Sequence, residues 1–379
     1  MPLIASAVKS GAQPYFSICV PQHNRTSFFL EALRSIVEQS IDDYEICISD
    51  DCSTDGRQDE IVQFLQHSGV AFQYFRQEAN VRYDANLRTA MSLARGQYIF
   101  LLGNDDCLAA STTLEVVRDR VQEVPDDIGV VIPNFMDWAT CSVRRRVNGT
   151  GVAGRGPDVV VQYYREFSFL SGIMLDARRA LAHQSTAYDG SEMYQMYIGS
   201  RILAEGAALL TLDIPIVRKD IQIAGERVDS LATKPKTRGW RVVPRRVPVL
   251  EIPRLVTNAI EASVDASTLS RYAERIILQF LLFTFPYWVV EFKYVHSVGY
   301  SIGFCLAARV NCLCDGVELG WGRLMRLRLV HLAISVAGLA VPVWLFRGLY
   351  PTLYRLAKAR LGLRESLRRG IAARAVQYP

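Results

Sequence analysis

The 379-residue chain lacks several features that define large protein classes. Its eight cysteines form no CxxC pair, so the sequence predicts reduced cytosolic thiols in place of a disulfide framework or a zinc site. No long apolar run follows Lys9, so a cleaved signal peptide is not expected. The chain also has no internal repeat and no low-complexity segment. No known nucleic-acid motif accompanies its basic residues, so nucleic acid is not an expected partner.

Basic residues are concentrated at the C-terminal end. From Trp321 onward the chain has eleven Lys or Arg residues and one acidic residue, Glu365, although the net charge of the whole chain is only +5. Half of all residues are hydrophobic, which is high for a freely soluble protein. A basic tail on a mildly acidic body is typical of proteins that bind an anionic surface. We therefore expect a membrane surface as a partner.

One stretch, QYIFLLGNDDCL at residues 97–108, organises the rest of the sequence. Its five consecutive apolar or aromatic residues, Tyr98 to Leu102, predict a strand that is buried on both faces. Asp105 and Asp106 follow directly, and adjacent carboxylates at such a position are costly without a cation. Ligands of open α/β sheets bind at the carboxyl ends of the strands. The stretch predicts a divalent metal that holds a phosphate; the alternative is a turn in which Asp105 caps the next helix.

Strand-like and helix-like segments alternate through the N-terminal half, which predicts an α/β fold with a mostly parallel sheet and flanking helices. Residues 1–14 are expected to be a disordered lead-in, and residues 15–225 the α/β domain. Within it, residues 80–86 are expected to form a polar loop, residues 148–157 a mobile loop and residues 191–204 a helix. The expected strands are Tyr15–Val20, Tyr44–Ser49, Val70–Phe75, Tyr98–Leu102 and Ile128–Ile132.

The C-terminal third has a different character. Residues 226–270 are rich in Arg, Lys and Pro and are expected to form a linker or irregular segment, followed by a helical, basic, membrane-associating region at residues 271–379. Residues 329–346 form an apolar stretch of about the minimum length for a membrane span, and residues 276–290 are also strongly apolar. Leucines and an isoleucine within residues 353–371 fall on one helical stripe, which indicates a helix that lies on anionic lipid. The alternative is a packed helical domain with a basic solvent face.

Polar clusters follow three of the predicted strands: His23-Asn24, Asp50-Asp51 and Asp105-Asp106. Sequential strands of such sheets are usually neighbours, so these clusters are expected to meet at one edge. Mg²⁺ and Mn²⁺ bind to one or two carboxylates together with phosphate oxygens. The sequence therefore predicts a site for a nucleotide whose diphosphate is held through Mn²⁺ or Mg²⁺.

The segments SICVPQHN, YEICISDDCSTD and ARGQYIFLLGNDD together resemble glycosyltransferase family 2 over about residues 15–220. The GNDD form resembles bacterial abequosyltransferases and related enzymes of O-antigen and exopolysaccharide assembly. The resemblance implies a GT-A fold and inverting transfer of a sugar from a nucleotide-sugar to a hydroxyl of a lipid-linked saccharide. It also implies a location at the cytoplasmic face of the inner membrane, peripheral or with a single span.

The resemblance also assigns roles to individual residues. Pro21 and Asp51 are expected to contact the nucleotide base with Asp50 beside them, while Asp105 and Asp106 are expected to hold the metal and the diphosphate. The full set expected to bind the donor is Pro21, Asn24, Asp50, Asp51, Asn80, Arg82, Asn86 and Asp105.

Two positions depart from the family pattern. Gly103 stands where many members have the first Asp of a DxD motif, and Gln195 stands where the family has its general base, six positions before an Arg that matches Arg201. A glutamine cannot accept a proton from the acceptor hydroxyl. Glu192 is expected on the same helical face one turn earlier and is the predicted base, with Asp189 as the alternative.

These departures leave a second hypothesis open, a catalytically inactive subunit that only binds a nucleotide-sugar. A nucleotidyltransferase is disfavoured because no Gly-rich loop bearing Lys or Arg follows the first strand. The run Arg144 to Arg146 is expected to be a solvated edge, with binding of an acidic acceptor as the minority hypothesis.

Overall fold

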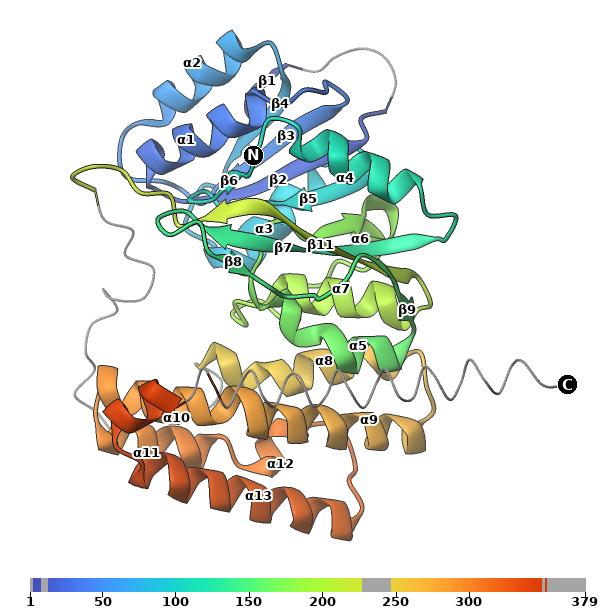
Figure 1. Ribbon diagram of the computed structural model, residues 1–379, viewed down its shortest axis with the longest axis vertical. Helices are drawn as coiled ribbons and strands as arrows, with labels where there is room; N and C mark the ends of the chain where they lie inside the picture. Colours follow the sequence, from blue (N-terminus) through green and yellow to red (C-terminus); the bar gives the residue numbers. More distant parts are fainter. Residues whose placement is uncertain (1–2, 8–12, 227–246, 350–351, 353–379) are drawn as a thin grey trace, which may run out of the picture. The chain divides into compact units, whose positions relative to one another are not determined.

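The computed structural model describes residues 3–7, 13–226, 247–349 and 352. These residues form two compact units (Figure 1). The first contains the described residues up to 226 together with Arg254–Tyr272, and the second contains residues 247–253 and the described residues from Ala273 onward.

The first unit is built on one mixed sheet with the strand order β1-β4-β3-β2-β5-β10-β7-β11-β6; β8 pairs with β7, and β9 pairs with β11. The strands are β1 (Leu3–Ala7), β2 (Phe16–Gln22), β3 (Tyr44–Asp50), β4 (Ala71–Arg76), β5 (Tyr98–Leu101), β6 (Cys107–Leu108), β7 (Ile128–Asp137), β8 (Val143–Arg144), β9 (Gly151–Arg155), β10 (Met174–Asp176) and β11 (Ala208–Lys219).

Helices flank this sheet on both faces (Figure 1). Apolar side chains such as Ile18 and Ile46 form a core with α1, α2 and α4, whereas α3 packs on β2 and β3. The expected α/β fold with flanking helices is confirmed. The helices are α1 (Thr26–Val37), α2 (Gln58–Ser68), α3 (Arg82–Ser92), α4 (Thr113–Gln122), α5 (Pro157–Tyr163), the 3₁₀ helix η1 (Tyr164–Ser168), α6 (Ala177–Ala182) and α7 (Tyr194–Ala204).

Strands β4, β3, β2 and β5 form the parallel part of the sheet that matters for the site. Gln22 at the end of β2 is in register with Asp50 at the end of β3, and Cys19 of β2 is in register with Leu101 at the end of β5. Each parallel neighbour is reached through a helical crossover. The carboxyl ends of β2, β3 and β5 therefore meet at one edge, as the sequence predicts.

Three local predictions in the first unit are wrong. Residues 3–7 of the expected lead-in form β1, antiparallel to β4, and residues 151–155 of the expected mobile loop form β9, antiparallel to β11. Both pair at sheet edges, where hydrogen bonds to a neighbouring strand decide the structure and local pattern is weak. The expected polar loop at residues 80–86 ends early, because α3 begins at Arg82.

Residues 248–270 form helices, so the expected linker is wrong there; residues 227–246 lie outside the described part. The amphipathic helix α8 buries Leu255, Val256, Ala259 and Ile260, and this burial overrides the irregular composition around it. The C-terminal elements are the 3₁₀ helix η3 (Pro248–Glu251), α8 (Ile252–Glu261), α9 (Ala266–Gln279), the π-helical turn η4 (Phe280–Thr284), α10 (Phe285–Val295), α11 (Val298–Ala307), α12 (Val310–Leu313) and α13 (Trp321–Ala340).

Two apolar segments bear on the predicted membrane region. Helices α9 and α10 run on through η4 as one 30-residue helix, Ala266–Val295, which is long and apolar enough to cross a bilayer. The expected apolar stretch at residues 329–346 is not one helix: α13 ends at Ala340, and a second helix, Val343–Leu349, is bent from it by 114°. Pro342 lies at the break. Proline has no backbone N–H, so it cannot donate the hydrogen bond that would continue α13. The predicted stripe at residues 353–371 lies outside the described residues.

Candidate active site

Gln22, the last residue of β2, connects the segments at the carboxyl edge of the sheet. Its backbone oxygen accepts hydrogen bonds from the Asp51 amide (2.8 Å) and from Asn86 Nδ2 (3.1 Å). Its side-chain Oε1 accepts from Asn104 Nδ2 (2.8 Å), and its Nε2 donates to the Asn24 carbonyl (2.6 Å). Gln22 was not among the residues predicted to form the site. The sequence feature that could have indicated it is a glutamine at the end of an apolar strand. A buried side-chain amide at such a position needs polar partners.

The Asp51 carboxylate lies at the N-terminus of α3. Its Oδ1 accepts from the Val81 amide (2.6 Å) and its Oδ2 from the Arg82 amide (3.0 Å), while only 4% of the residue is exposed. A carboxylate at this position is stabilised by the helix dipole and by otherwise unsatisfied amides. Asp51 therefore shapes the loop that the resemblance assigns to the donor, and each of its oxygens retains acceptor capacity for a ligand.

Asp50 is fully buried behind Asp51. Its carboxylate accepts from the Ser53 amide (2.7 Å) and from the Tyr74 hydroxyl. Burial, followed by the hydrogen bond to Asp50, raises the pKa of Tyr74, so this phenol stays protonated as a donor. Asp50 thus fixes the loop after β3, which begins with Asp51.

The other residues predicted to bind the nucleotide-sugar lie on the same segments. Pro21 is half-buried in β2 opposite Ser49. Asn24 accepts from the Thr54 amide (2.7 Å), and Asn80 donates to the Asp51 carbonyl (3.5 Å). Among the described residues Asn86 Oδ1 is a buried oxygen with no hydrogen-bond partner.

Backbone strain concentrates in these loops. Of seven non-glycine residues with positive φ in the described chain, six border the site: Asn24, Arg25, Cys52, Arg82, Glu192 and Asp220. Each such conformation costs on the order of 1–3 kcal/mol and persists only where the surroundings fix it. Hydrogen bonds from the site constrain several of them: Gln22 binds Asn24, Asp51 binds Arg82, and Asp106 binds Asp220.

Asp105 and Asp106 lie in the turn between β5 and β6. Arg25 donates to Asp105 Oδ2 (2.7 Å). Asp106, which is 4% exposed, accepts from Ser171 Oγ (2.5 Å) and from the Asp220 amide (2.9 Å). The alternative in which Asp105 caps the next helix is wrong, because α4 begins only at Thr113.

The electrostatics of this pair favour a bound cation. Burial, and then the charge of Asp105, raise the pKa of Asp106 to about 7. Burial also raises the pKa of Asp105, although the Arg25 guanidinium opposes that shift. Two carboxylates are a donor set that fits Mg²⁺ or Mn²⁺ when phosphate oxygens and water complete the shell. Among the described residues, no group of three or more His, Cys, Asp or Glu side chains is placed to hold a metal, so substrate oxygens would have to contribute.

Gly103 has a physical reason to depart from the DxD pattern. A Cβ atom at this position would lie 3.1 Å from Asp106 Oδ2, 3.2 Å from Asp105 Oδ1 and 3.3 Å from Ser171 Oγ. An aspartate there would require the two carboxylates or Ser171 to shift. Glycine therefore permits the close arrangement in which Ser171 bonds to Asp106.

Arg146 is buried, so the expected solvated edge is wrong for this residue, whereas the other two arginines of the run are exposed. Its guanidinium donates to the carbonyls of Pro133 (2.8 Å), Phe169 (2.9 Å) and Ser171 (3.0 Å). Burial lowers the pKa of Arg146 to about 10, and the nearby charge of Asp106 partly opposes this. Arg146 thus fixes Ser171, the partner of Asp106. Local sequence could not distinguish it from its neighbours in the run.

On the opposite side of α3, Gln195 is buried with both ends of its amide occupied. It accepts from the Tyr83 hydroxyl (2.9 Å) and donates to the Phe167 carbonyl (3.1 Å). The expected helical pairing of Glu192 with this position is wrong, because α7 begins at Tyr194 and Glu192 has a left-handed backbone (φ 56°) in the preceding loop. Burial, then the charges of Asp84 and Glu192, raise the pKa of Tyr83, the phenol that donates to Gln195.

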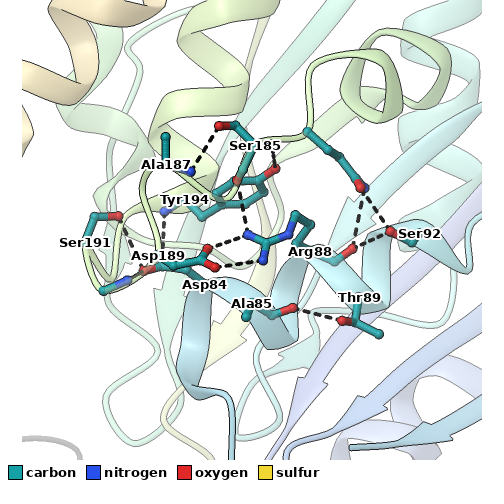
Figure 2. Close-up of polar contacts among 12 residues, drawn as sticks. Asp84, Ala85, Arg88, Thr89, Ser92, Ser185, Ala187, Asp189, Ser191 and Tyr194 are labelled. Carbon is teal, nitrogen blue, oxygen red and sulfur yellow. Dashed lines mark hydrogen bonds and ion pairs between the residues drawn. The ribbon is translucent and has the colours of Figure 1, made fainter. Parts of the chain in front are cut away.

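Asp189 is engaged elsewhere. Both of its carboxylate oxygens accept from Arg88 of α3, one of them at 2.8 Å from Nη2 (Figure 2). A carboxylate held bidentately by a guanidinium has a strong preference for its ionised form and a fixed orientation. This engagement disfavours Asp189 as a base.

The mixed α/β sheet with flanking helices, which carries a buried diacid after its central strand β5, has a GT-A-like fold. The structure of Staphylococcus aureus TarS 1–349 in complex with UDP-GlcNAc matches this fold, with a TM-score of 0.57 and 16% identity over 86% of this chain and 89% of that one. Residues 17–172 match the family model described as Glycosyl transferase family 2. These residues are therefore similar to glycosyltransferase family 2.

Curated relatives align with only part of the chain. Abequosyltransferase RfbV of Salmonella typhimurium is 39% identical over 95 residues, which are 24% of this chain and 28% of the relative. A Campylobacter jejuni protein named GalNAc(5)-diNAcBac-PP-undecaprenol beta-1,3-glucosyltransferase is 33% identical over 115 residues, 29% of this chain and 37% of the relative. The chain thus spans about a third of the length of these relatives. Both names denote the transfer of a sugar.

The raised pKa of Asp106 predicts how the stability of the metal-free protein depends on pH. The folded state holds a proton on Asp106 up to about pH 7, whereas an unfolded Asp loses it near pH 4, so the free energy of unfolding falls as pH rises through this window. The slope that Asp106 contributes approaches about −1.4 kcal/mol per pH unit. Asp106→Asn should remove this contribution, as measured by urea denaturation in EDTA at several pH values. Identical slopes in both proteins would contradict the assignment.

Proposed function

We propose that this protein transfers a sugar from a nucleotide-sugar to a hydroxyl of a lipid-linked saccharide in the synthesis of a cell-surface polysaccharide. The observation that carries the proposal is the convergence of Asp51, Asp105 and Asp106 at one sheet edge within a glycosyltransferase family 2 domain. The names of the two relatives support the sugar transfer, and the Campylobacter name includes an undecaprenol-linked acceptor.

In this proposal the donor binds along the carboxyl ends of β2, β3 and β5. Asp51 and Pro21 contact the base, and Asp105 and Asp106 hold Mn²⁺ or Mg²⁺ next to the diphosphate. A bound metal ion supplies positive charge that stabilises the leaving diphosphate. Arg25, already paired with Asp105, places a further positive charge at this end of the site.

Glu192 is the proposed general base. Direct displacement at the anomeric carbon inverts its configuration and requires the acceptor hydroxyl to lose its proton as it attacks. Gln195 cannot take this proton, and Asp189 is held by Arg88. We assign the role to Glu192, which lies in the same loop three positions before Gln195.

Nucleotide binding tests the donor site. Asp105→Ala should abolish the metal-dependent part of UDP, GDP or CDP binding, because a carboxylate that holds the ion is lost. Asp51→Ala should weaken binding with and without Mn²⁺, because its role concerns the base. Isothermal titration with and without Mn²⁺ separates the two effects, and Asp59→Ala on the exposed surface of α2 serves as the control. Unchanged affinities in both site variants would refute the donor site.

Substitution of Glu192 tests the catalytic step. Glu192→Gln should lower turnover by about 10²–10⁴-fold with little change in donor affinity, because a positioned base contributes this much to the rate. Rates of sugar transfer and the dissociation constant of the donor are both measured. If the wild type binds a nucleotide-sugar but transfers nothing to any acceptor offered, the alternative of an inactive binding subunit replaces the proposal.

We also propose that the second unit attaches the protein to the cytoplasmic face of an anionic membrane. Helix α13 exposes apolar side chains along one face, including Leu329 (63% exposed), Leu332 and Val336, and Trp321 at its start is 78% exposed. Soluble proteins rarely leave such a row in water. Arginines within and after this helix supply attraction to anionic lipid.

Paired substitutions test this surface. Leu332→Asp with Val336→Asp should lower co-sedimentation of the full chain with vesicles containing phosphatidylglycerol by about tenfold or more, because two apolar side chains no longer enter the lipid. Val116→Asp, at an exposed apolar position of α4, is the matched control. Undiminished binding of the double variant would exclude this face as the membrane-binding surface and would favour the helix Ala266–Val295 instead.

A further inference from the structure

Asp84, in the first turn of α3, binds the loop that precedes α7 (Figure 2). This loop, residues 184–193, is called the acceptor-side loop below. The Asp84 carboxylate is buried, and it accepts from the amides of Gly190 (2.8 Å), Glu192 (2.9 Å) and Tyr194 (3.1 Å). Ser191 Oγ lies at 3.5 Å from the same carboxylate. One side chain thus receives three backbone donors from five consecutive residues.

These bonds replace a cap that α7 does not make itself. Its N-cap residue, Met193, forms no side-chain capping hydrogen bond within the described structure. The amides at a helix start need acceptors, and a carboxylate there is also favoured by the helix dipole. Asp84 supplies both from a different helix, more than a hundred residues earlier in the chain.

Arg88 holds the other part of the acceptor-side loop, one turn further along α3. It forms the bidentate pair with Asp189 and donates to the Ser185 carbonyl (3.1 Å), while its guanidinium lies over the Tyr194 ring at 5.6 Å (Figure 2). Asp84 and Arg88 therefore contact the loop at separate points.

The loop includes Glu192 in a left-handed conformation, which needs external support in a residue with a side chain. The Asp84 bond to the Glu192 amide provides that support. The N-terminus of the same helix, α3, is bound by Asp51 on the donor side. A single helix thus connects the proposed base-binding carboxylate with the loop that carries the proposed general base.

We propose that Asp84 is a positioning residue for sugar transfer: it caps α7 from α3 and fixes the backbone of Glu192 in the orientation that the reaction needs. This inference rests on the proposed function. Asp84 itself touches neither substrate nor metal in this role. Its carboxylate acts through the three amides that it binds.

Asp84→Asn tests the proposal with little change in side-chain volume. Asparagine keeps one acceptor oxygen, but its NH₂ group cannot accept hydrogen bonds from backbone N–H groups. The loop therefore loses most of the hydrogen bonds that fix it. Hydrogen exchange in peptides covering residues 188–196 should accelerate about tenfold, whereas peptides of β4 should be unchanged. Asp59→Asn, in the exposed first turn of α2, is the matched control. Arg88→Gln should instead loosen residues 184–189.

The functional measurement uses the same variants. The dissociation constant for UDP, GDP or CDP with Mn²⁺ should stay within about twofold of the wild type, while release of nucleoside diphosphate from the sugar donor should slow about tenfold or more. This separation distinguishes positioning from general loss of structure. Unchanged exchange at residues 188–196 overturns the proposal, and so does accelerated exchange with unchanged turnover. If the wild type transfers no sugar, the proposed function fails, and the exchange result alone decides whether Asp84 holds the loop.

Discussion

The hydrogen bonds of Gln22 are the interaction on which the candidate active site depends. A fully buried glutamine at the end of β2 must satisfy its amide and its carbonyl inside the protein. Its four bonds tie together the loop after β2, the loop after β3, helix α3 and the turn after β5. Neighbouring loops can then hold non-glycine residues in left-handed conformations. The edge of the sheet thus gains a fixed arrangement before any ligand binds.

Burial of charge is the second constraint. Asp106 is nearly inaccessible and is paired with a hydroxyl and an amide, while Arg25 pairs with Asp105. Arg146 supports this arrangement indirectly by holding the carbonyl of Ser171. Two carboxylates that are close together and poorly hydrated suit a divalent metal ion that binds together with the substrate. The glycine at position 103 permits this close arrangement, because a Cβ atom there would crowd both carboxylates.

Helix α3 lies between the two halves of the site. Asp51 binds its N-terminus, and its own Asp84 and Arg88 bind the loop before α7. A donor and an acceptor must be held in fixed relative positions for displacement to occur. One rigid helix that binds both sides meets this requirement with few contacts. The second unit supplies a different property, an apolar helical face that suits attachment to a membrane.

Sequence patterns alone determined the parallel α/β core and the convergence of three polar clusters, because buried strands have continuous apolar runs and parallel neighbours end at one edge. The tertiary structure decided what local pattern does not encode. Edge strands β1 and β9 depend on pairing with a neighbouring strand. Arg146 is buried by contacts with residues distant in sequence. Glu192 lies outside α7, where Asp84 of α3 binds its amide. Such contacts join residues far apart in the chain, so only the folded molecule reveals them.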